Sequence, residues 1–364
     1  MSAPSRTLMV MAAGTGGHIF PGLAIAQAMQ ARGWSVRWLG TAHGMEGEIV
    51  PRHGLALDTI EFAGLRGKGI GHAVRGVFAF FSSLVRSIGL IRAAHADVVL
   101  GMGGYVTVPG GIAARISGRP LALVNADAAP LLSNKLLGPF AQRVLFGFAG
   151  DFGSLAGKAV VTGNPVRREI CALPDPAARY SGRSGPLKVL VVGGSLGARA
   201  LNEAVPAALA LIPANERPQV THQSGKANID SLRELYAKAG VEAELVAFID
   251  DMPRRLADAD LVICRAGAVT AAELTAAGVA SILVPLVVST TSHQRDNAEL
   301  LAKAGAALHL PQAELSAAKL ASMLQQIDRA RCLAMAKAAR SIGKPDATER
   351  IADIIESLAS GGKA

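Results

Sequence analysis

The sequence has few aromatic residues, few cysteines and no long uninterrupted apolar run. Phe, Trp and Tyr make up 4% of its 364 residues, too few for the stacking platforms that bind single-stranded nucleic acid. The cysteines at positions 171, 264 and 332 are far apart and odd in number, which excludes a disulfide framework or a CxxC metal pair. The most apolar stretch, Gly76 to Ile91, contains Arg86 and is shorter than the ~20 residues of a membrane span. The N-terminus has no signal-peptide pattern, so we expect a reducing cytoplasm.

The residues that are abundant indicate a folded, basic protein. Half of the sequence is hydrophobic and 18% is charged, which excludes a disordered chain. A length of 364 residues is typical of two domains. With 37 Lys and Arg against 28 Asp and Glu, the formal net charge is +9, and such a charge favours anionic partners. Because aromatics are scarce, we expect phosphorylated metabolites or an anionic membrane surface rather than nucleic acid.

Short apolar runs alternate with helical segments, the pattern of an α/β fold with parallel sheets. A helix is predicted from Pro21 to Arg32, since proline often begins a helix and Gly33 can end it. A Pro-, Gly- and Ser-rich stretch near residues 163–186 indicates a junction. We therefore expect two Rossmann-like domains facing a central cleft, residues 1–163 and 164–364, with the last helix able to pack back on the first domain. The expected strands are 8–13, 36–39, 97–101, 121–124, 144–146, 160–161, 187–192, a strand near 220, 245–249, 261–264, 281–284 and 307–310.

Three glycine-rich loops follow expected strands, at residues 14–17, 101–105 and 193–197. A strand, a glycine loop and a helix together bring free backbone N–H groups and a helix N-terminus to the carboxyl edge of a sheet, where anions bind. Tight turns from strand to helix would need the same glycines. Because two of the loops open the two expected domains at matching points, we predict a phosphate-bearing ligand between the domains.

Two familiar phosphate motifs do not fit these loops. Ile19 and Val106 stand where the dinucleotide fingerprint G-x-G-x-x-G needs its last glycine. A P-loop needs a glycine five residues before its Gly-Lys pair, and none of the Gly-Lys pairs in this sequence has one.

One motif favours a different enzyme class. Residues 193–197 satisfy G-x-S-x-G, the nucleophile elbow of serine hydrolases, between an expected strand and an expected helix. A hydrolase that uses Ser195 is therefore an alternative, although it leaves the first domain unexplained. The remaining members of its triad would be Asp250 or Asp260, then His293 or His309.

Three polar positions have a functional and a structural interpretation. His18 ends the first glycine loop, where it is either a general base or a cap of the turn. Glu273 completes a capping box with Thr270, or it holds ribose hydroxyls as acidic residues do in nucleotide folds. Asp258 and Asp260 form a D-x-D pair that looks like the metal motif of some sugar transferases. Because the pair lies just before a strand, at the edge opposite the glycine loops, we interpret it as a solvated turn. No cluster of ligands suggests another metal site.

Residues 62–92 combine apolar side chains three and four apart with flanking cations. This pattern describes an interfacial helix that dips into an anionic leaflet, or a core helix with a solvated basic face. The apolar positions are Leu65, Ile70, Val74, Val77, Phe78, Phe80, Phe81, Leu84 and Val85, and the cations are Arg66, Lys68, Arg75, Arg86 and Arg92.

Seven strings, in order, resemble the MurG family, the peripheral-membrane N-acetylglucosaminyltransferases of peptidoglycan synthesis, which have the GT-B fold. The likeness runs from about residue 8 to the PDATER string at 345–350. The strings are GTGGHIFPGLA at 14–24, GMGGYV at 101–106, GNPVR at 163–167, GGSLGAR at 193–199, HQSGK at 222–226, FIDDM at 248–252 and CRAGAVT at 264–270.

The resemblance implies a role for each matching residue. His18 would be the catalytic base, and Glu273 the acid that binds the donor's ribose. Arg167 and Ser195 would contact the diphosphate, and Gln294 the sugar hydroxyls. Further donor-binding positions would be Thr15, Gly16, Gly17, Ile249, Ala268, Val269, Thr270, Ala271 and Ala272, and the acceptor loop would contain Gly103, Gly104 and Tyr105.

The sequence departs from the family pattern at two places. Where the family has His-Glu-Gln-Asn, this chain has Val-Asn-Ala-Asp at 124–127. The family's sugar-contacting Asn therefore falls on Asp127, with Asn125 two residues earlier. The segment 287–292 before Gln294 also differs from the family's more polar run.

The activity implied by the resemblance is transfer of N-acetylglucosamine from UDP-N-acetylglucosamine to undecaprenyl-pyrophosphoryl-MurNAc-pentapeptide, without cofactor or metal. It would occur on the cytoplasmic face of the inner membrane and serve cell-wall synthesis, cell shape and division. The remaining alternative is a catalytically silent membrane protein that binds a nucleotide sugar.

Overall fold

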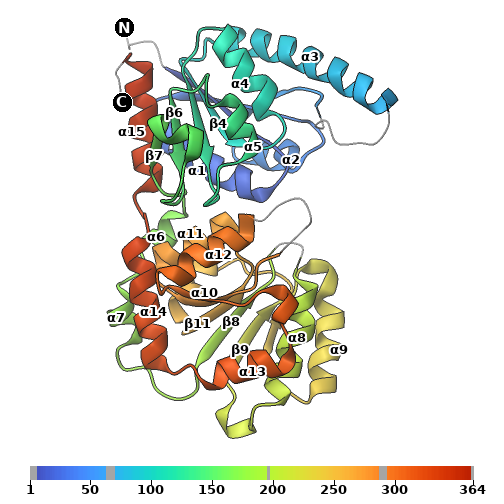
Figure 1. Cartoon of the computed structure of the whole chain (residues 1–364), viewed down its shortest axis with the longest axis vertical. Helices are drawn as coiled ribbons and strands as arrows, with labels where there is room; N and C mark the ends of the chain where they lie inside the picture. Colours follow the sequence, from blue (N-terminus) through green and yellow to red (C-terminus); the bar gives the residue numbers. More distant parts are fainter. Residues whose placement is uncertain (1–5, 63–69, 195–196, 287–292, 362–364) are drawn as a thin grey trace. The chain divides into compact units, whose positions relative to one another are not determined.

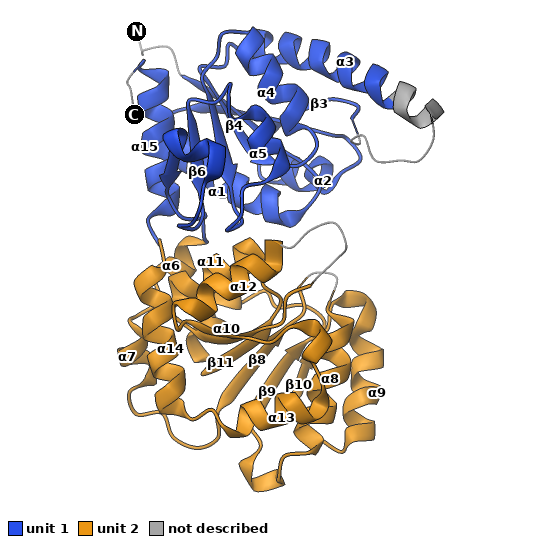
Figure 2. Cartoon of the chain, in the orientation of Figure 1, with its two compact units in different colours: residues 1–166, 345–364 blue, residues 167–344 orange. Residues whose placement is uncertain are grey.

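The computed structural model describes residues 6–62, 70–194, 197–286 and 293–361 (Figure 1). The expected features at residues 63–69, at Ser195 and at 287–292 lie outside these ranges. The chain forms two compact units (Figure 2). Unit 1 is Met1–Val166 with Pro345–Ala364, and unit 2 is Arg167–Lys344.

Unit 1 is built on a seven-stranded parallel sheet with the strand order β3-β2-β1-β4-β5-β6-β7. Its strands are β1 Thr7–Ala12, β2 Ser35–Gly40, β3 Ala56–Thr59, β4 Val98–Gly103, β5 Leu121–Asn125, β6 Arg143–Phe146 and β7 Ala159–Val161. Its helices are α1 Gly16–Ala31, α2 Met45–Arg52, α3 Ile70–Ala93, α4 Thr107–Ile116, α5 Leu132–Leu137 and α15 Ala347–Ala359.

The central strand of unit 1 is buried on both faces. Leu8 and Val10 pack in the cluster that contains Ile355 of α15, whereas Met9 and Met11 pack in the cluster that faces α3 and α4. Because successive strand residues point to opposite faces, a strand covered on both sides reads as one apolar run. The run at the start of the sequence therefore predicts β1 well.

Unit 2 repeats this architecture with six parallel strands in the order β10-β9-β8-β11-β12-β13. Its strands are β8 Lys188–Val192, β9 Gln219–Gln223, β10 Glu244–Val246, β11 Leu261–Cys264, β12 Ala280–Leu283 and β13 Ala307–His309. Its helices are α6 Arg168–Cys171, α7 Pro176–Tyr180, α8 Arg199–Ala210, α9 Ile229–Ala239, α10 Met252–Asp258, α11 Ala268–Ala277, α12 His293–Lys303, α13 Ala317–Gln325 and α14 Arg329–Ile342.

Both sheets have the strand order of a Rossmann fold, which confirms the expected fold class. In such sheets the chain reverses its winding direction between two central strands, and ligands bind beyond the carboxyl ends of those strands. These strands are β1 and β4 in unit 1, and β8 and β11 in unit 2. All three glycine loops follow one of them, and so does the turn before α11.

One local expectation differs from the structure. The first helix begins at Gly16 rather than Pro21, so Pro21 lies inside α1 and His18 in its first turn. Thr15 is the N-cap because its backbone is extended, and this conformation begins the helix five residues earlier. The stretch 167–186, at the start of the expected second domain, lies in unit 2. There Arg179 of α7 donates to the carbonyl oxygens of Ala277 (2.6 Å) and Gly278 (2.5 Å).

Candidate active site

The first glycine loop joins β1 to α1 and presents the start of the helix. Gly14 has a φ of +97°, a conformation that glycine adopts without strain. Thr15 makes no side-chain cap, so the first-turn amides of α1 are not bound by its hydroxyl. Gly16 and Gly17 form this turn together with His18. Three of the expected donor-binding residues, Thr15, Gly16 and Gly17, therefore lie with the candidate base at the N-terminus of α1.

His18 is held against the second glycine loop. Its Nδ1 lies 3.4 Å from the Thr15 hydroxyl oxygen, and a Cβ placed on Gly103 would be 2.7 Å from its Cδ2. Burial lowers the pKa of His18 below its ordinary value of 6.5, while a hydrogen bond to the Ala13 backbone and the charge of Asp127 act in the opposite direction. The imidazole is therefore neutral near pH 7 and able to accept a proton.

The glycines of the second loop make room for neighbouring groups. Gly103 leaves space for the His18 ring, and a Cβ on Gly104 would lie 2.2 Å from the Ala13 carbonyl oxygen. Both glycines have positive φ, +114° and +86°. Tyr105 follows them, and its hydroxyl lies 3.3 Å from that of Thr41. The second glycine loop thus packs directly against the first.

Asn125 is committed to the structure of its own loop. Its side chain is fully buried. Its amide donates to the carbonyl oxygens of Asp127 (2.7 Å) and Ala129 (3.0 Å), and its Oδ1 accepts from the Leu131 amide at 2.8 Å. A side chain used in this way is unsuited to bind a sugar. Asp127, whose charge acts on His18, is the better candidate of the two.

In unit 2, the glycine loop after β8 is held by Gln223 of β9. The Gln223 Oε1 accepts hydrogen bonds from the amides of Gly193 and Gly194, each at 3.1 Å, and its Nε2 donates to the Gly194 carbonyl at 2.9 Å. These two amides, which we expected to be free for a phosphate, are therefore already used. Ser195, the expected diphosphate contact, lies outside the described residues.

Arg167 and Glu273 form an ion pair in unit 2. The Arg167 Nη2 and Nε donate to the same carboxylate oxygen, Oε1, at 2.8 and 3.1 Å. Glu273 is the sixth residue of α11, whose N-cap is Gly267, so the capping-box interpretation with Thr270 is wrong. Burial raises the pKa of Glu273 above its ordinary value, and the charge and hydrogen bonds of Arg167 offset this rise only in part.

The start of α11 is the other anion-binding element of unit 2. Its N-cap, Gly267, offers no side-chain cap, and the helix dipole favours an anion beside such a first turn. Ala268, Val269 and Thr270 are half-buried. Ala271 and Ala272 are buried on the inner side of the helix, so their side chains are unsuited to touch a ligand.

The two other expected donor contacts are partly engaged. Ile249 is buried, whereas its neighbour Phe248 is 49% exposed and has the Lys226 ammonium 5.9 Å from its ring centre. The Gln294 Oε1 accepts a hydrogen bond from the Leu286 amide at 2.9 Å.

The D-x-D pair is not a solvated turn, because Asp260 is fully buried. Arg183 (2.6 Å) and Arg329 (3.2 Å) bind its two oxygens, and the Lys188 amide donates to it at 2.9 Å. Burial alone would raise the pKa of Asp260, but these three contacts lower it. Asp260 precedes β11 and so stands at the amino edge of the sheet. There it cannot serve a triad at the carboxyl edge.

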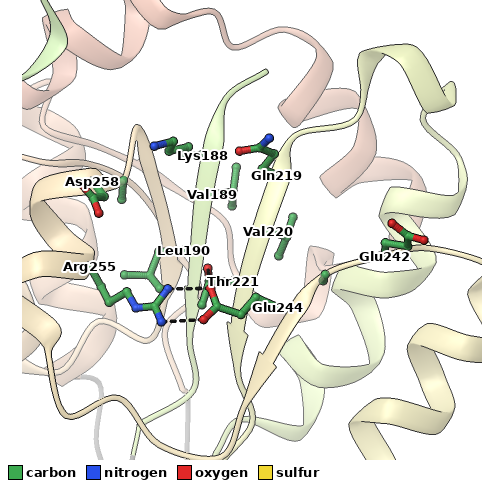
Figure 3. Close-up of a pocket in the computed structure, with 12 residues that line it drawn as sticks. Lys188, Val189, Leu190, Gln219, Val220, Thr221, Glu242, Glu244, Arg255 and Asp258 are labelled. Atoms are coloured by element: carbon green, nitrogen blue, oxygen red, sulfur yellow. Dashed lines mark hydrogen bonds and ion pairs between the residues drawn. The ribbon is translucent and has the colours of Figure 1, made fainter. Parts of the chain in front are cut away.

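A hollow of about 500 Å³ lies over the amino-terminal halves of β8, β9 and β10 (Figure 3). At its wall Arg255 donates to both oxygens of Glu244 at 2.6 Å, and the Thr221 hydroxyl donates to the same carboxylate at 2.8 Å. Because ligands of parallel sheets bind beyond the carboxyl ends, this hollow is not part of the candidate site.

Two buried residues that bind the glycine loops were not predicted from the sequence. Glu46 binds the Gly14 amide at 3.1 Å, and Gln223 binds the loop of unit 2. Gln223 belongs to the HQSGK string, which was a signal without an assigned role. No motif marks Glu46.

Comparison with known proteins covers both units. Residues 8–146 match the glycosyltransferase family 28 N-terminal domain, and residues 188–358 match the glycosyltransferase family 28 C-terminal domain. The crystal structure of Acinetobacter baumannii MurG superposes with a TM-score of 0.85 at 34% identity, covering 97% of this chain and 99% of that one. These matches confirm the GT-B fold.

Two sequence relatives are more similar still. The Herminiimonas arsenicoxydans protein is 65% identical over 353 residues, covering 97% of this chain and 99% of its own length. The Janthinobacterium sp. (strain Marseille) protein is 63% identical with the same coverage. Both are named UDP-N-acetylglucosamine–N-acetylmuramyl-(pentapeptide) pyrophosphoryl-undecaprenol N-acetylglucosamine transferase. The comparisons do not support the serine hydrolase.

The family matches span both units, and the relatives align over nearly the whole chain. The chain is a family 28 glycosyltransferase and belongs to the MurG family of N-acetylglucosaminyltransferases.

Proposed function

We propose that the chain transfers N-acetylglucosamine from UDP-N-acetylglucosamine to the C4 hydroxyl of undecaprenyl-pyrophosphoryl-MurNAc-pentapeptide, with inversion at the anomeric carbon. The observation that carries the proposal is the nearly full-length likeness to relatives named for this transfer. The reaction would be the last cytoplasmic step of peptidoglycan precursor synthesis.

The donor is bound by unit 2 in this proposal. Glu273 holds the ribose hydroxyls, because a largely buried carboxylate that is paired with Arg167 is a strong acceptor for a diol. The first turn of α11 receives the diphosphate, helped by Arg167 and Ser195. Gln294, whose carbonyl oxygen is fixed by the Leu286 amide, directs its amide group to the sugar hydroxyls.

His18 is the proposed general base. Its lowered pKa keeps the imidazole neutral, so that it can take the proton of the acceptor hydroxyl as that oxygen attacks. The negative charge that develops on the departing diphosphate is stabilised by Arg167 and by the α11 amides. Pre-organised donors of this kind each contribute about 10²–10³ in rate at other oxyanion sites.

Helix α3 is the proposed membrane contact. The inner side of the helix carries Ser83, Ser87 and Ile91, all buried, while its outer side exposes the aromatic and aliphatic residues. Since Phe80, Leu84 and Ile88 are packed against the core, part of the apolar surface of this helix faces inward and part faces outward. The exposed fractions are 51% for Val77, 76% for Phe78, 57% for Phe81 and 69% for Val85.

The 18-residue window Gly76–Ala93 is long and apolar enough to cross a membrane by composition, and 17% of it is buried. However, α3 packs against α4, and Arg86 donates to the Thr59 carbonyl at 2.6 Å. These contacts favour a helix that lies in the interface of the cytoplasmic leaflet rather than across it. The formal charge of +9 supports an anionic surface.

The reaction can be tested with radiolabelled UDP-N-acetylglucosamine and a lipid-linked MurNAc-pentapeptide analogue in the presence of EDTA. Label in the lipid fraction is the expected result and would show that no divalent metal is needed. UDP binding without transfer would favour the silent nucleotide-sugar-binding protein. Failure to bind UDP would contradict the proposal altogether.

Membrane docking can be tested by sedimentation with vesicles. We expect the chain to bind vesicles that contain phosphatidylglycerol more tightly than vesicles of phosphatidylcholine alone. The double substitution Phe78→Glu, Val85→Glu should weaken binding at least tenfold. Leu211→Glu changes a residue of unit 2 that is 57% exposed and should bind like the wild type. Equal binding by all three proteins would contradict a role for α3.

A further inference from the structure

Glu46 is a fully buried carboxylate that the proposed chemistry does not use. It is the second residue of α2, and its side chain has no exposed surface. Among the residues that the structure describes, no cation forms an ion pair with it. A buried charge without a counter-ion is costly unless hydrogen bonds satisfy it.

Three donors satisfy Glu46. Its Oε1 accepts from the Thr41 amide at 3.1 Å and from the Thr41 hydroxyl at 2.6 Å, and its Oε2 accepts from the Gly14 amide at 3.1 Å. All three contacts require an acceptor on the side chain. An ionised carboxylate meets this requirement, whereas the amide of a glutamine would turn an NH₂ group toward one of the donors.

The surrounding backbone leaves room for this one side chain. A Cβ on Gly44 would lie 2.4 Å from both Glu46 carboxylate oxygens, and a Cβ on Gly40 would lie 2.8 Å from the Glu46 Cγ. Both glycines are thus needed where they stand. The pocket for the carboxylate is formed by the turn that follows β2.

The contacts of Glu46 connect both glycine loops of unit 1. Because the Thr41 hydroxyl gives its proton to Glu46, the Tyr105 hydroxyl 3.3 Å away is the donor in its contact with Thr41. A Cβ on Gly14 would lie 3.4 Å from the Tyr105 ring. The carboxylate therefore fixes Gly14 directly and Tyr105 through Thr41.

The fixed loop in turn positions His18. Gly14 precedes Thr15, whose carbonyl accepts the His18 amide at 3.0 Å and whose hydroxyl lies 3.4 Å from the imidazole Nδ1. On the other side the ring meets Gly103 of the second loop. A shift of either loop would therefore move the imidazole, and displacements of about 1 Å can cost a hundredfold in rate.

Unit 2 contains a counterpart. There Gln223, at the end of β9, binds the first two amides of the glycine loop after β8. Glu46 follows β2, which occupies in unit 1 the place that β9 occupies in unit 2. In both units, a buried side chain at or after the end of the neighbouring strand binds backbone amides of the glycine loop.

From these contacts we propose that Glu46 is a positioning residue for the transfer reaction: its ionised carboxylate holds the two glycine loops of unit 1 so that His18 meets the acceptor hydroxyl. This inference rests on the proposed function. It concerns kcat rather than UDP binding, because Glu46 lies in unit 1 and touches none of the proposed UDP contacts of unit 2.

The test compares Glu46→Gln with Glu48→Gln, a substitution on the same helix at a carboxylate that is 67% exposed. We expect Glu46→Gln to lower kcat at least tenfold at a temperature well below its melting point, with the affinity for UDP within twofold of wild type. Hydrogen exchange of the peptide that contains Gly14 should become at least tenfold faster. Glu48→Gln should match the wild type in all three measurements.

Several outcomes would overturn the inference. A Glu46→Gln variant that melts at a lower temperature but retains kcat would indicate a purely structural role. If Glu46→Gln does not fold, Thr41→Val takes its place, because it removes the hydroxyl link to Tyr105 and should lower kcat without affecting UDP binding; unchanged kcat would contradict the inference. If the wild type itself transfers no sugar, the proposed function fails, and unchanged exchange in Glu46→Gln would then also reject Glu46 as the residue that holds the loop.

Discussion

The guanidinium of Arg167 donates two hydrogen bonds to a single oxygen of Glu273, across 106 residues of sequence. Arg167 stands at the beginning of unit 2 and Glu273 in the second turn of α11. The sequence assigned these residues to the diphosphate and to the ribose, and the structure joins them in one ion pair. A donor that uses both groups would therefore bind to a pre-formed charge pair.

This pair makes the effects of substitution at the two positions interdependent. We expect Arg167→Ala to lower kcat by about 10²–10³, because the leaving diphosphate loses a donor. Glu273→Gln should weaken UDP binding. The double variant should lower kcat/KM by less than the two single substitutions combined, since the effects of residues in contact are not additive. Calorimetric titration with UDP and steady-state kinetics check these effects.

Arg168→Ala is the matched control for Arg167→Ala, because Arg168 is its exposed neighbour, and we expect wild-type kinetics. Because the Arg167 side chain is 46% exposed, the ion pair itself should contribute only about 0.2–1 kcal/mol to stability. Near-wild-type turnover of Arg167→Ala would reject its role in catalysis.

The charge of Asp127 beside His18 leads to a second prediction, on the pH dependence of kcat. Rates that depend on a neutral His18 rise with pH through its pKa, which burial sets below 6.5 and which Asp127 partly raises. Asp127→Asn removes the negative charge, so the pKa of His18 should fall further and the acidic limb of kcat against pH should move to lower pH. A weaker base should also lower the plateau.

The measurement for this second prediction is a pH profile of kcat at saturating substrates. Asp230→Asn serves as control, because Asp230 is a surface carboxylate of unit 2 whose side chain is 87% exposed. A limb that moves upward in Asp127→Asn, or one that moves equally in the control, would contradict the assignment of His18 as the base.

Much of the fold follows from local pattern. The apolar runs of β1 and β11 are buried on both faces, and each run predicts its strand to within a residue. β3, Ala56–Thr59, was not predicted because its four residues, Ala-Leu-Asp-Thr, are half-polar at the sheet edge. Asp58 of β3 forms an ion pair with Arg37 of the neighbouring strand β2, which explains why this strand contains a buried carboxylate.

The site was predictable in its positions but not in its contacts. The sequence predicted that the three glycine loops follow strands, and the structure places them at the ends of β1, β4 and β8. Ligand binding at these loops stays a prediction. By contrast, the use of the Gly193 and Gly194 amides by Gln223 depends on the register between β8 and β9. The burial of Asp260 between Arg183 and Arg329 likewise joins residues far apart in sequence, which no local spacing reveals.

The attachment of the C-terminal helix leads to a third prediction. Arg32, after α1, binds Glu349, Asp353 (2.8 Å) and Glu356 (2.9 Å), which lie on one face of α15. Hydrogen bonds to these carboxylates raise the pKa of Arg32. Arg32→Ala would leave three like charges three and four residues apart, which repel each other. We expect hydrogen exchange of α15 to become about tenfold faster, corresponding to ~1–2 kcal/mol for a network of three ion pairs.

The matched control is Arg52→Ala, which breaks an exposed pair with Glu48 and should leave α15 unchanged. The effect of Arg32→Ala should shrink in high salt, because partly exposed charges are screened. Exchange in α15 that is the same in wild type and Arg32→Ala would show that apolar contacts alone hold the helix.

The fourth prediction concerns acid stability and follows from a histidine whose pKa is strongly lowered in the folded state. His222 is fully buried in β9, its Nδ1 3.0 Å from the Tyr236 hydroxyl and its Nε2 3.2 Å from the Asn202 Oδ1. Burial lowers the pKa of His222 to about 3. An unfolded histidine titrates near 6.5, so between pH 6.5 and about 3 the unfolded chain binds one more proton than the folded chain. Stability contributed by the neutral ring is therefore present above pH 6.5 and decreases as pH falls, by about 1.4 kcal/mol for each pH unit.

Urea unfolding at pH 7 and pH 5 tests this linkage. The free energy of unfolding of the wild type should fall between pH 7 and pH 5, and about 2 kcal/mol of this fall should come from His222. His222→Gln should be less stable than the wild type at pH 7. Its own fall between pH 7 and pH 5 should be smaller by this amount. His43→Gln, at an exposed histidine, is the control and should keep the wild-type loss. If His222→Gln loses as much stability as the wild type, the folded chain accommodates a charged ring at this position, and the acid sensitivity has another origin.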